Sequence, residues 1–175
     1  MVAPDLTRLG PGDAEVALRS FVRRYAAELL AVPGDDRGDE LAARLGPAGE
    51  SALGVVSDVT RTWGVLGHEL HRVLTLDDPL LHPAAADPRQ RHWDTAPPDT
   101  VDEALTLLGH EVDALLDVMA GVTSADEWTR KGEVAGGGTL SALDLVKEAV
   151  RVGAEGLDRV RDVLAAVRDQ DRPSG

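Results

Sequence analysis

Cysteine is absent from this sequence of 175 residues. A disulfide bond, a thiolate nucleophile and a zinc site built on sulfur are therefore excluded. A metal site would have to use His, Asp or Glu side chains, and there are only five histidines, at positions 68, 71, 82, 92 and 110. Two catalytic signatures are also missing: a glycine-rich loop that leads directly into Lys and Ser or Thr, and a Gly-x-Ser-x-Gly elbow.

Basic residues and long apolar runs are scarce as well. The sequence has 18 Lys and Arg residues and 31 Asp and Glu residues, which gives a formal net charge of -13. A molecule with this charge repels phosphate backbones and anionic membrane surfaces. The apolar runs are far shorter than the ~20 residues needed to cross a bilayer, and the first residues lack the pattern of a signal peptide. We therefore expect a soluble cytoplasmic protein with no nucleic-acid partner and no membrane partner.

What the sequence does contain is four long stretches with apolar residues at helical spacing, at about 14–31, 51–74, 100–120 and 140–167. Ser51 can cap the second stretch, and Thr100 with Glu103 forms a capping box before the third. Weaker signals predict a short helical turn within 35–50 and a short helix at 124–128. The sequence contains no run of alternating β-branched residues that would indicate a strand. The pattern predicts one all-α domain over 1–168, folded as a four-helix bundle, and a disordered tail over 169–175.

The stretch at 51–74, SALGVVSDVTRTWGVLGHELHRVL, places the carboxylate of Asp58 among apolar residues. Its seam repeats at steps of three and four residues: Val56, Val59, Trp63, Leu66, Leu70 and Val73. Asp58 and Thr62 lie one helical row to the side, so the width of the buried face decides whether Asp58 points inward. In one interpretation Asp58 is a half-exposed residue with an arginine partner, and in the other it is functional.

Residues 77–99, DDPLLHPAAADPRQRHWDTAPPD, contain five prolines and no sustained period, which predicts a long loop between the second and third helices. Its apolar side chains are expected to anchor it: Leu80, Leu81 and Trp93. Its basic side chains are then available to contact a ligand: His82, His92, Arg89 and Arg91. The alternative is an ordered surface excursion without a function.

The order of these elements, with the segments SALGVVSDVTRTWGVL, VTSADEW and TLSALDLVKEAVRVGAEGLDRVRDVL, resembles the DinB/YfiT-like superfamily. That superfamily consists of metal-dependent bundles of up-down-down-up type and includes mycothiol-dependent maleylpyruvate isomerase-type domains. The resemblance implies a divalent metal held by a histidine of the second helix and a His-x-x-x-His pair of the last helix. The histidine position falls on Asp58. The pair falls on Val152 and Gly156, or on Gly153 and Leu157 with a shift of one residue, and none of these four can bind a metal.

Three functional hypotheses follow from this departure. The first is a bundle that has lost the metal of the family, needs no cofactor and binds a small molecule or a protein. The second is a metal-dependent enzyme, by resemblance a transferase or isomerase that uses a thiol of the mycothiol type, in which Asp58 and loop histidines such as His82 or His92 complete an unusual site for zinc or nickel. The third is an interaction protein that forms a homodimer, and it is compatible with the first.

Gly153 and Gly156 each cost about 1 kcal/mol relative to Ala inside a helix, so each calls for a compensating role. One explanation is the close approach of a neighbouring helix or of the Trp63 side chain. The other is a pocket left where the metal ligands of the family would stand, with Asp58 and Thr62 on its opposite wall. Glu148 and Glu155 are expected on the solvated face of the same helix.

Overall fold

A computed structural model describes residues 6–30 and 37–170 of the chain. Within these ranges the chain forms five α-helices: α1 (Pro11–Leu30), α2 (Arg37–Ala43), α3 (Ala52–Thr75), α4 (Val101–Ala120) and α5 (Ala142–Gln170). It also forms three short strands: β1 (Leu80–Leu81), β2 (Lys131–Val134) and β3 (Thr139–Ser141). The predicted predominance of helix is confirmed. The small sheet corrects the expectation that the chain has no strand.

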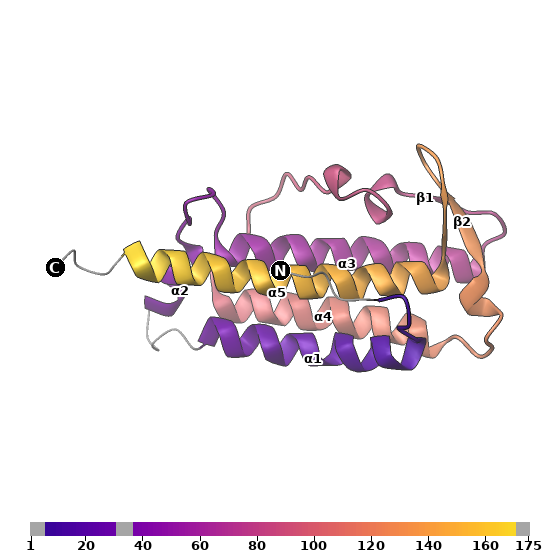
Figure 1. Ribbon diagram of the computed structural model, residues 1–175, viewed down its shortest axis with the longest axis horizontal. Helices are drawn as coiled ribbons and strands as arrows, with labels where there is room; N and C mark the ends of the chain where they lie inside the picture. The colour runs from indigo at the N-terminus through magenta and orange to yellow at the C-terminus, as the bar shows by residue number, and fades with distance from the viewer. Residues whose placement is uncertain (1–5, 31–36, 171–175) are drawn as a thin grey trace.

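The four long helices lie lengthwise beside one another (Figure 1). α3 packs against α4 and α5, and α1 packs against the same two helices. Figure 1 shows α1 and α5 running in one direction and α3 and α4 in the other. The chain must therefore travel back along the molecule between α3 and α4. It does so through residues 76–100, which we call the return segment and which contain β1 and two 3-10 turns, Pro83–Ala85 and Pro88–Gln90.

The two predicted helix caps are found in the structure, whereas α1 begins at Pro11 and α5 at Ala142, each within three residues of the predicted start. The Ser51 hydroxyl accepts a hydrogen bond from the Gly54 N–H at 3.0 Å, and the Thr100 hydroxyl accepts one from the Glu103 N–H at 3.2 Å. α5 begins with a third cap, in which the Ser141 hydroxyl accepts from the Asp144 N–H. These bonds satisfy backbone donors that a helix start leaves without a partner.

Of three smaller predicted features, one is found as predicted and two differ. α2 provides the helical turn expected within 35–50. The short helix expected at 124–128 is a single 3-10 turn, Glu127–Thr129, because the Glu127 carboxylate accepts N–H bonds from Thr123 and Ser124 and closes a tight loop. α5 continues to Gln170, so residues 169–170 belong to the helix and not to a tail. The rest of the predicted tail, 171–175, lies outside the described residues.

The sheet closes one end of the helices. β2 lies in the middle, parallel to β1 and antiparallel to β3. The turn between β2 and β3 uses three consecutive glycines, Gly136 to Gly138, with φ of 102°, 113° and 93°. Residues with a side chain rarely adopt such angles, so this turn depends on glycine.

The core between the long helices is built around the aromatic side chains Phe21, Tyr25 and Trp63, all at most 1% exposed. The Trp63 indole N–H donates to the Ala149 carbonyl at 2.8 Å, and the Tyr25 hydroxyl donates to the Gly153 carbonyl at 2.9 Å. α1 and α3 are thereby bonded to α5 at two successive turns. None of the helices in the described ranges combines the length and the apolar character needed to cross a bilayer.

Candidate functional site

The return segment lies over α3 and is attached to the helices at several points. Leu81, Ala84 and Ala85 are buried, whereas Leu80 is 58% exposed and does not anchor the segment as predicted. The Arg61 guanidinium of α3 donates to the carbonyls of Thr95 and Ala96, both at 3.2 Å. These contacts give the segment a defined path, and among the hollows beside it two are lined by Trp93.

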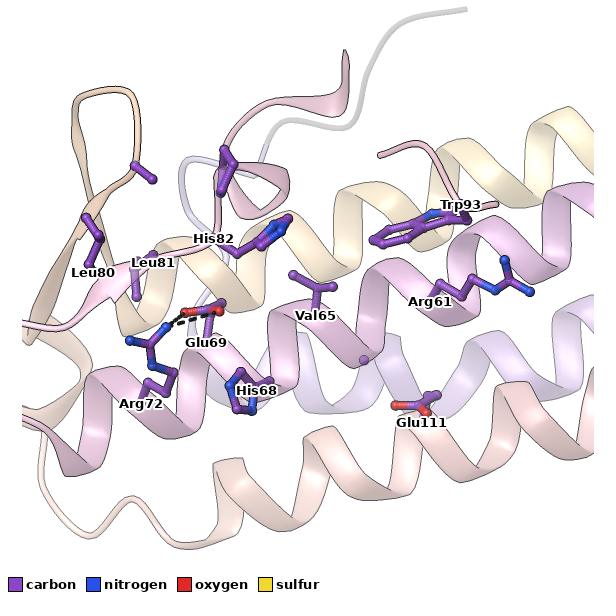
Figure 2. Close-up of a pocket in the computed structure, with 13 residues that line it drawn as sticks. Arg61, Val65, His68, Glu69, Arg72, Leu80, Leu81, His82, Trp93 and Glu111 are labelled. Atoms are coloured by element: carbon purple, nitrogen blue, oxygen red, sulfur yellow. Dashed lines mark hydrogen bonds and ion pairs between the residues drawn. The ribbon is translucent and has the colours of Figure 1, made fainter. Parts of the chain in front are cut away.

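The larger hollow is an open groove of about 770 Å³ along α3, which we call the α3 groove (Figure 2). Gly64, Val65 and Glu69 of α3 form its floor. Leu81 and His82 of the return segment stand at one end, and the Trp93 ring stands at the other. Most of the surface is apolar, so the groove has the size and character of a site for a small organic molecule.

Polar side chains of the α3 groove are held in fixed orientations. Glu69 is 3% exposed, and one of its carboxylate oxygens lies 3.1 Å from Nη1 of Arg72. His82 caps the turn at Pro83–Ala85: its Nδ1 accepts a hydrogen bond from the Ala84 N–H at 3.1 Å. In the neutral ring the proton is then on Nε2, which leaves an N–H donor for a ligand.

Trp93 separates the two hollows and contributes to the wall of both. Its indole nitrogen is the one buried side-chain donor in the described part of the chain that has no hydrogen-bond partner. Leaving such a donor unsatisfied costs about 1–3 kcal/mol. Unsatisfied buried groups are uncommon and often mark a place where a ligand or water belongs.

The smaller hollow, of about 240 Å³, is the Asp58 pocket. It brings together three of the predicted residues: Asp58 and Thr62 from α3 and Gly156 from α5. Three arginines also line it, Arg91 from the return segment and Arg151 and Arg159 from α5. The other predicted residues lie elsewhere. His82 lines the α3 groove, Gly153 is buried in the core, and His92 is exposed and lines neither of these two hollows.

The two glycines of α5 are explained by close approach. A Cβ on Gly153 would lie 2.7 Å from atoms of both Phe21 and Trp63, and a Cβ on Gly156 would lie 2.3 Å from Val59 and 2.5 Å from the Tyr25 hydroxyl. Burial raises the pKa of the Tyr25 phenol well above its usual range, so this hydroxyl remains a donor. Gly156 therefore serves both explanations, because it also lines the Asp58 pocket.

Asp58 is half-exposed, and its carboxylate lies 3.8 Å from Nη2 of Arg159. Partial burial raises the pKa of Asp58 above its ordinary value of 3.8, although Arg159 and Arg61 oppose the shift. Arg159 bonds more closely to Glu50. The structure therefore agrees with the interpretation in which Asp58 has an arginine partner, and it also places Asp58 in a pocket.

The prediction that Glu148 lies on the solvated face of its helix is wrong, because its side chain is part of an ion-pair network. Its side chain is 18% exposed and contacts both Arg91, which is 10% exposed, and Arg151. Arg151 also bonds to Glu155. Burial acts to raise the pKa of Glu148, but hydrogen bonds from the two arginines outweigh it and hold the pKa below its usual range. The network joins the return segment to α5.

The Asp58 pocket does not fit a divalent metal. A zinc or nickel site needs several His, Asp or Glu side chains that converge on one point. Here Asp58 is surrounded by guanidinium groups, and Glu155 is paired with Arg151. No group of three or more possible metal ligands is present among the described residues. His68 and His71 are both exposed on α3, as expected.

Several residues of the α3 groove were not predicted. Glu69 follows Leu66 of the apolar seam by three positions, and this spacing is a signal that it faces inward. Glu111 of α4 belongs to a helix without Lys or Arg, so no counter-ion is available on its own helix. Val65 carries no signal of its own, because the return segment creates the groove above it.

Comparison of the chain with models of protein families, with characterised proteins and with solved structures finds no match.

Proposed function

We propose that this protein is a four-helix bundle of the DinB/YfiT-like kind that binds a small organic molecule in the α3 groove without a metal. The α3 groove is the observation that carries the proposal. Its volume of about 770 Å³ lies within the range of ligand sites, which are mostly apolar with a few positioned polar groups. The fixed N–H of His82 and the Glu69–Arg72 pair supply such groups.

Two features support the kinship with these bundles. The helix directions follow the up-down-down-up order, and the long connection falls between the two helices that run the same way. Asp58 also shares one pocket with Val152 and Gly156, as the alignment of the family ligands implies. The comparisons add nothing to this support.

The residues of the Asp58 pocket favour the metal-free form of the proposal. Arginines occupy the space around Asp58, and positive charge there repels a metal cation. His82 and His92, which the enzyme hypothesis enlists as ligands, do not line this pocket. The thiol-dependent transferase or isomerase therefore lacks a donor set among the described residues. A protein partner or a homodimer stays a prediction from the sequence.

Filling the α3 groove tests the proposal. Val65 is partly exposed on the floor of the groove, so Val65→Trp should fill the space and leave the buried core unchanged. We expect a set of small aromatic compounds to show saturable binding to the native chain by ligand-observed NMR and no binding to Val65→Trp. Val16→Trp is the matched control, because Val16 is 70% exposed on α1 and outside the groove.

The same screen includes zinc and nickel ions, followed by thermal denaturation. We expect neither ion to cause a saturable shift in melting temperature. The proposal is wrong if no compound binds the native chain, or if compounds bind Val65→Trp as tightly as Val16→Trp. A saturable metal shift that Asp58→Ala abolishes would restore the enzyme hypothesis.

A further inference from the structure

Four charged side chains line the α3 groove, and three of them already have an ion-pair or hydrogen-bond partner. Arg72 is paired with Glu69 at 3.1 Å. Arg61 points its guanidinium at the carbonyls of Thr95 and Ala96, away from the centre of the groove (Figure 2). The fourth is Glu111, which is partly buried and has no ion pair or hydrogen bond within the described part of the chain.

Glu111 reaches the groove because α3 has a glycine where the two helices meet. A Cβ on Gly64 would lie 3.1 Å from Oε2 of Glu111, so the carboxylate rests against the backbone of α3. Figure 2 shows Glu111 on one side of α3 and Trp93 on the other, and Val65 projects from α3 on the side of Trp93. A molecule that lies across Gly64 and Val65 therefore has a carboxylate at one end and an aromatic ring at the other.

The fixed charges on the helix that carries Glu111 are of one sign. Residues 92–129 contain nine Asp and Glu residues, no Lys or Arg, and two histidines, His92 and His110, both of which are exposed. Acidic residues on the exposed face of α4 add to the field: Asp102, Glu103, Asp113 and Asp117. An unpaired, partly buried carboxylate in such a field attracts a positive charge.

We propose that the ligand of the α3 groove is an organic cation, in which an ammonium group pairs with Glu111 and an apolar body lies over Val65 toward Leu81 and Trp93. This inference rests on the proposed function, since it names the class of small molecule that the groove takes. The Trp93 ring favours the same class, because aromatic faces attract cations as well as apolar groups. The ammonium group thus gives Glu111 the ion-pair partner that it lacks among the described residues.

Three probes with one body separate charge from shape: phenylbutylamine, phenylbutanol and phenylbutyrate. Dissociation constants are measured by NMR titration for the native chain, for Glu111→Gln and for Asp113→Asn. The last is the matched control, because it removes the same charge from an exposed position of α4 outside the groove. Glu111 has no ion pair or hydrogen bond to lose among residues 6–30 and 37–170, so Glu111→Gln should fold normally, and a melting curve checks this.

For the native chain and for Asp113→Asn, we expect the amine to bind about three- to fivefold more tightly than the alcohol, and the acid to bind most weakly. For Glu111→Gln, the amine and the alcohol should bind equally, with the affinity for the alcohol unchanged. The inference is overturned if the alcohol binds the native chain and the amine binds no better, or if Asp113→Asn removes the preference as fully as Glu111→Gln. Failure of all three probes to bind would instead count against the proposed function.

Discussion

Replacing Gly153 by alanine should destabilise the protein, although alanine favours helix. The added methyl carbon would lie 2.7 Å from Cε2 of Phe21 and 2.7 Å from Cζ2 of Trp63. Neither ring is free to move away. Trp63 is hydrogen-bonded to the Ala149 carbonyl, both rings are at most 1% exposed, and their centroids lie 5.9 Å apart. The methyl group must therefore push apart α1, α3 and α5 at the centre of the core.

The magnitude follows from two opposing terms. Overpacking a close-packed core costs about 1–3 kcal/mol, and a clash with two fixed rings belongs in the upper part of that range. The higher helix propensity of alanine returns about 1 kcal/mol. We therefore expect Gly153→Ala to lower the free energy of unfolding by about 1–2 kcal/mol. In a chain of this size each kcal/mol lowers the melting temperature by about 2–4 °C.

Gly109→Ala is the matched control. Gly109 is also inside a long helix, but a Cβ there would meet nothing within 4 Å. Only the propensity term remains, so this change should stabilise the protein by about 0.5–1 kcal/mol. Urea denaturation followed by circular dichroism measures both variants. If Gly153→Ala stabilised the chain as Gly109→Ala does, the space at Gly153 would be larger than the structure indicates.

Two further predictions concern the ion pairs. Arg91→Ala leaves Glu148 with one arginine and detaches the return segment from α5. We therefore expect the free energy of unfolding to fall by about 1–3 kcal/mol and amide exchange over residues 82–99 to become faster. Arg89→Ala, an exposed control in the same segment, should change neither quantity. Equal exchange in the two variants would contradict this role of Arg91. Asp58→Asn should stabilise the protein at pH 7. Partial burial raises the pKa of Asp58 above 3.8, so the folded state binds its proton more tightly than the unfolded state. Stability therefore falls as the pH rises from 3.8 through the raised pKa of the folded state. The advantage of Asp58→Asn should therefore shrink as pH falls toward 4, measured by urea midpoints, and an advantage independent of pH would show that charge is not its cause.

The long helices could be predicted because their signals are local. Apolar spacing and caps such as Ser51 and Thr100 act within one turn of the chain. The sheet could not be predicted in this way. β1 is two residues long and pairs Leu80 with Glu133, a residue more than fifty positions away. That pairing depends on the path of the return segment, which the local sequence does not specify.

The Asp58 pocket was partly predictable for a similar reason. Asp58 and Thr62 are four residues apart on one helix, and this spacing places them on the same face. The position of Gly156 opposite them came from the resemblance. The α3 groove was missed because residues far apart in the chain form it. Val65, Leu81 and Trp93 come together only when the return segment folds back over α3.

The network beside the Asp58 pocket also bears on the α3 groove. Arg91, which bonds to Glu148 and to the Ala84 carbonyl, is two residues from Trp93 and does not itself line the groove. These bonds fix the chain beside two residues that line the groove. Ala84 is two residues after His82, and Trp93 is two residues after Arg91 itself. The charged cluster beside the Asp58 pocket thus holds the walls of the neighbouring α3 groove in place. A wall fixed in this way costs little ordering entropy when a ligand binds, and Arg91→Ala should therefore weaken binding in the groove without touching the ligand.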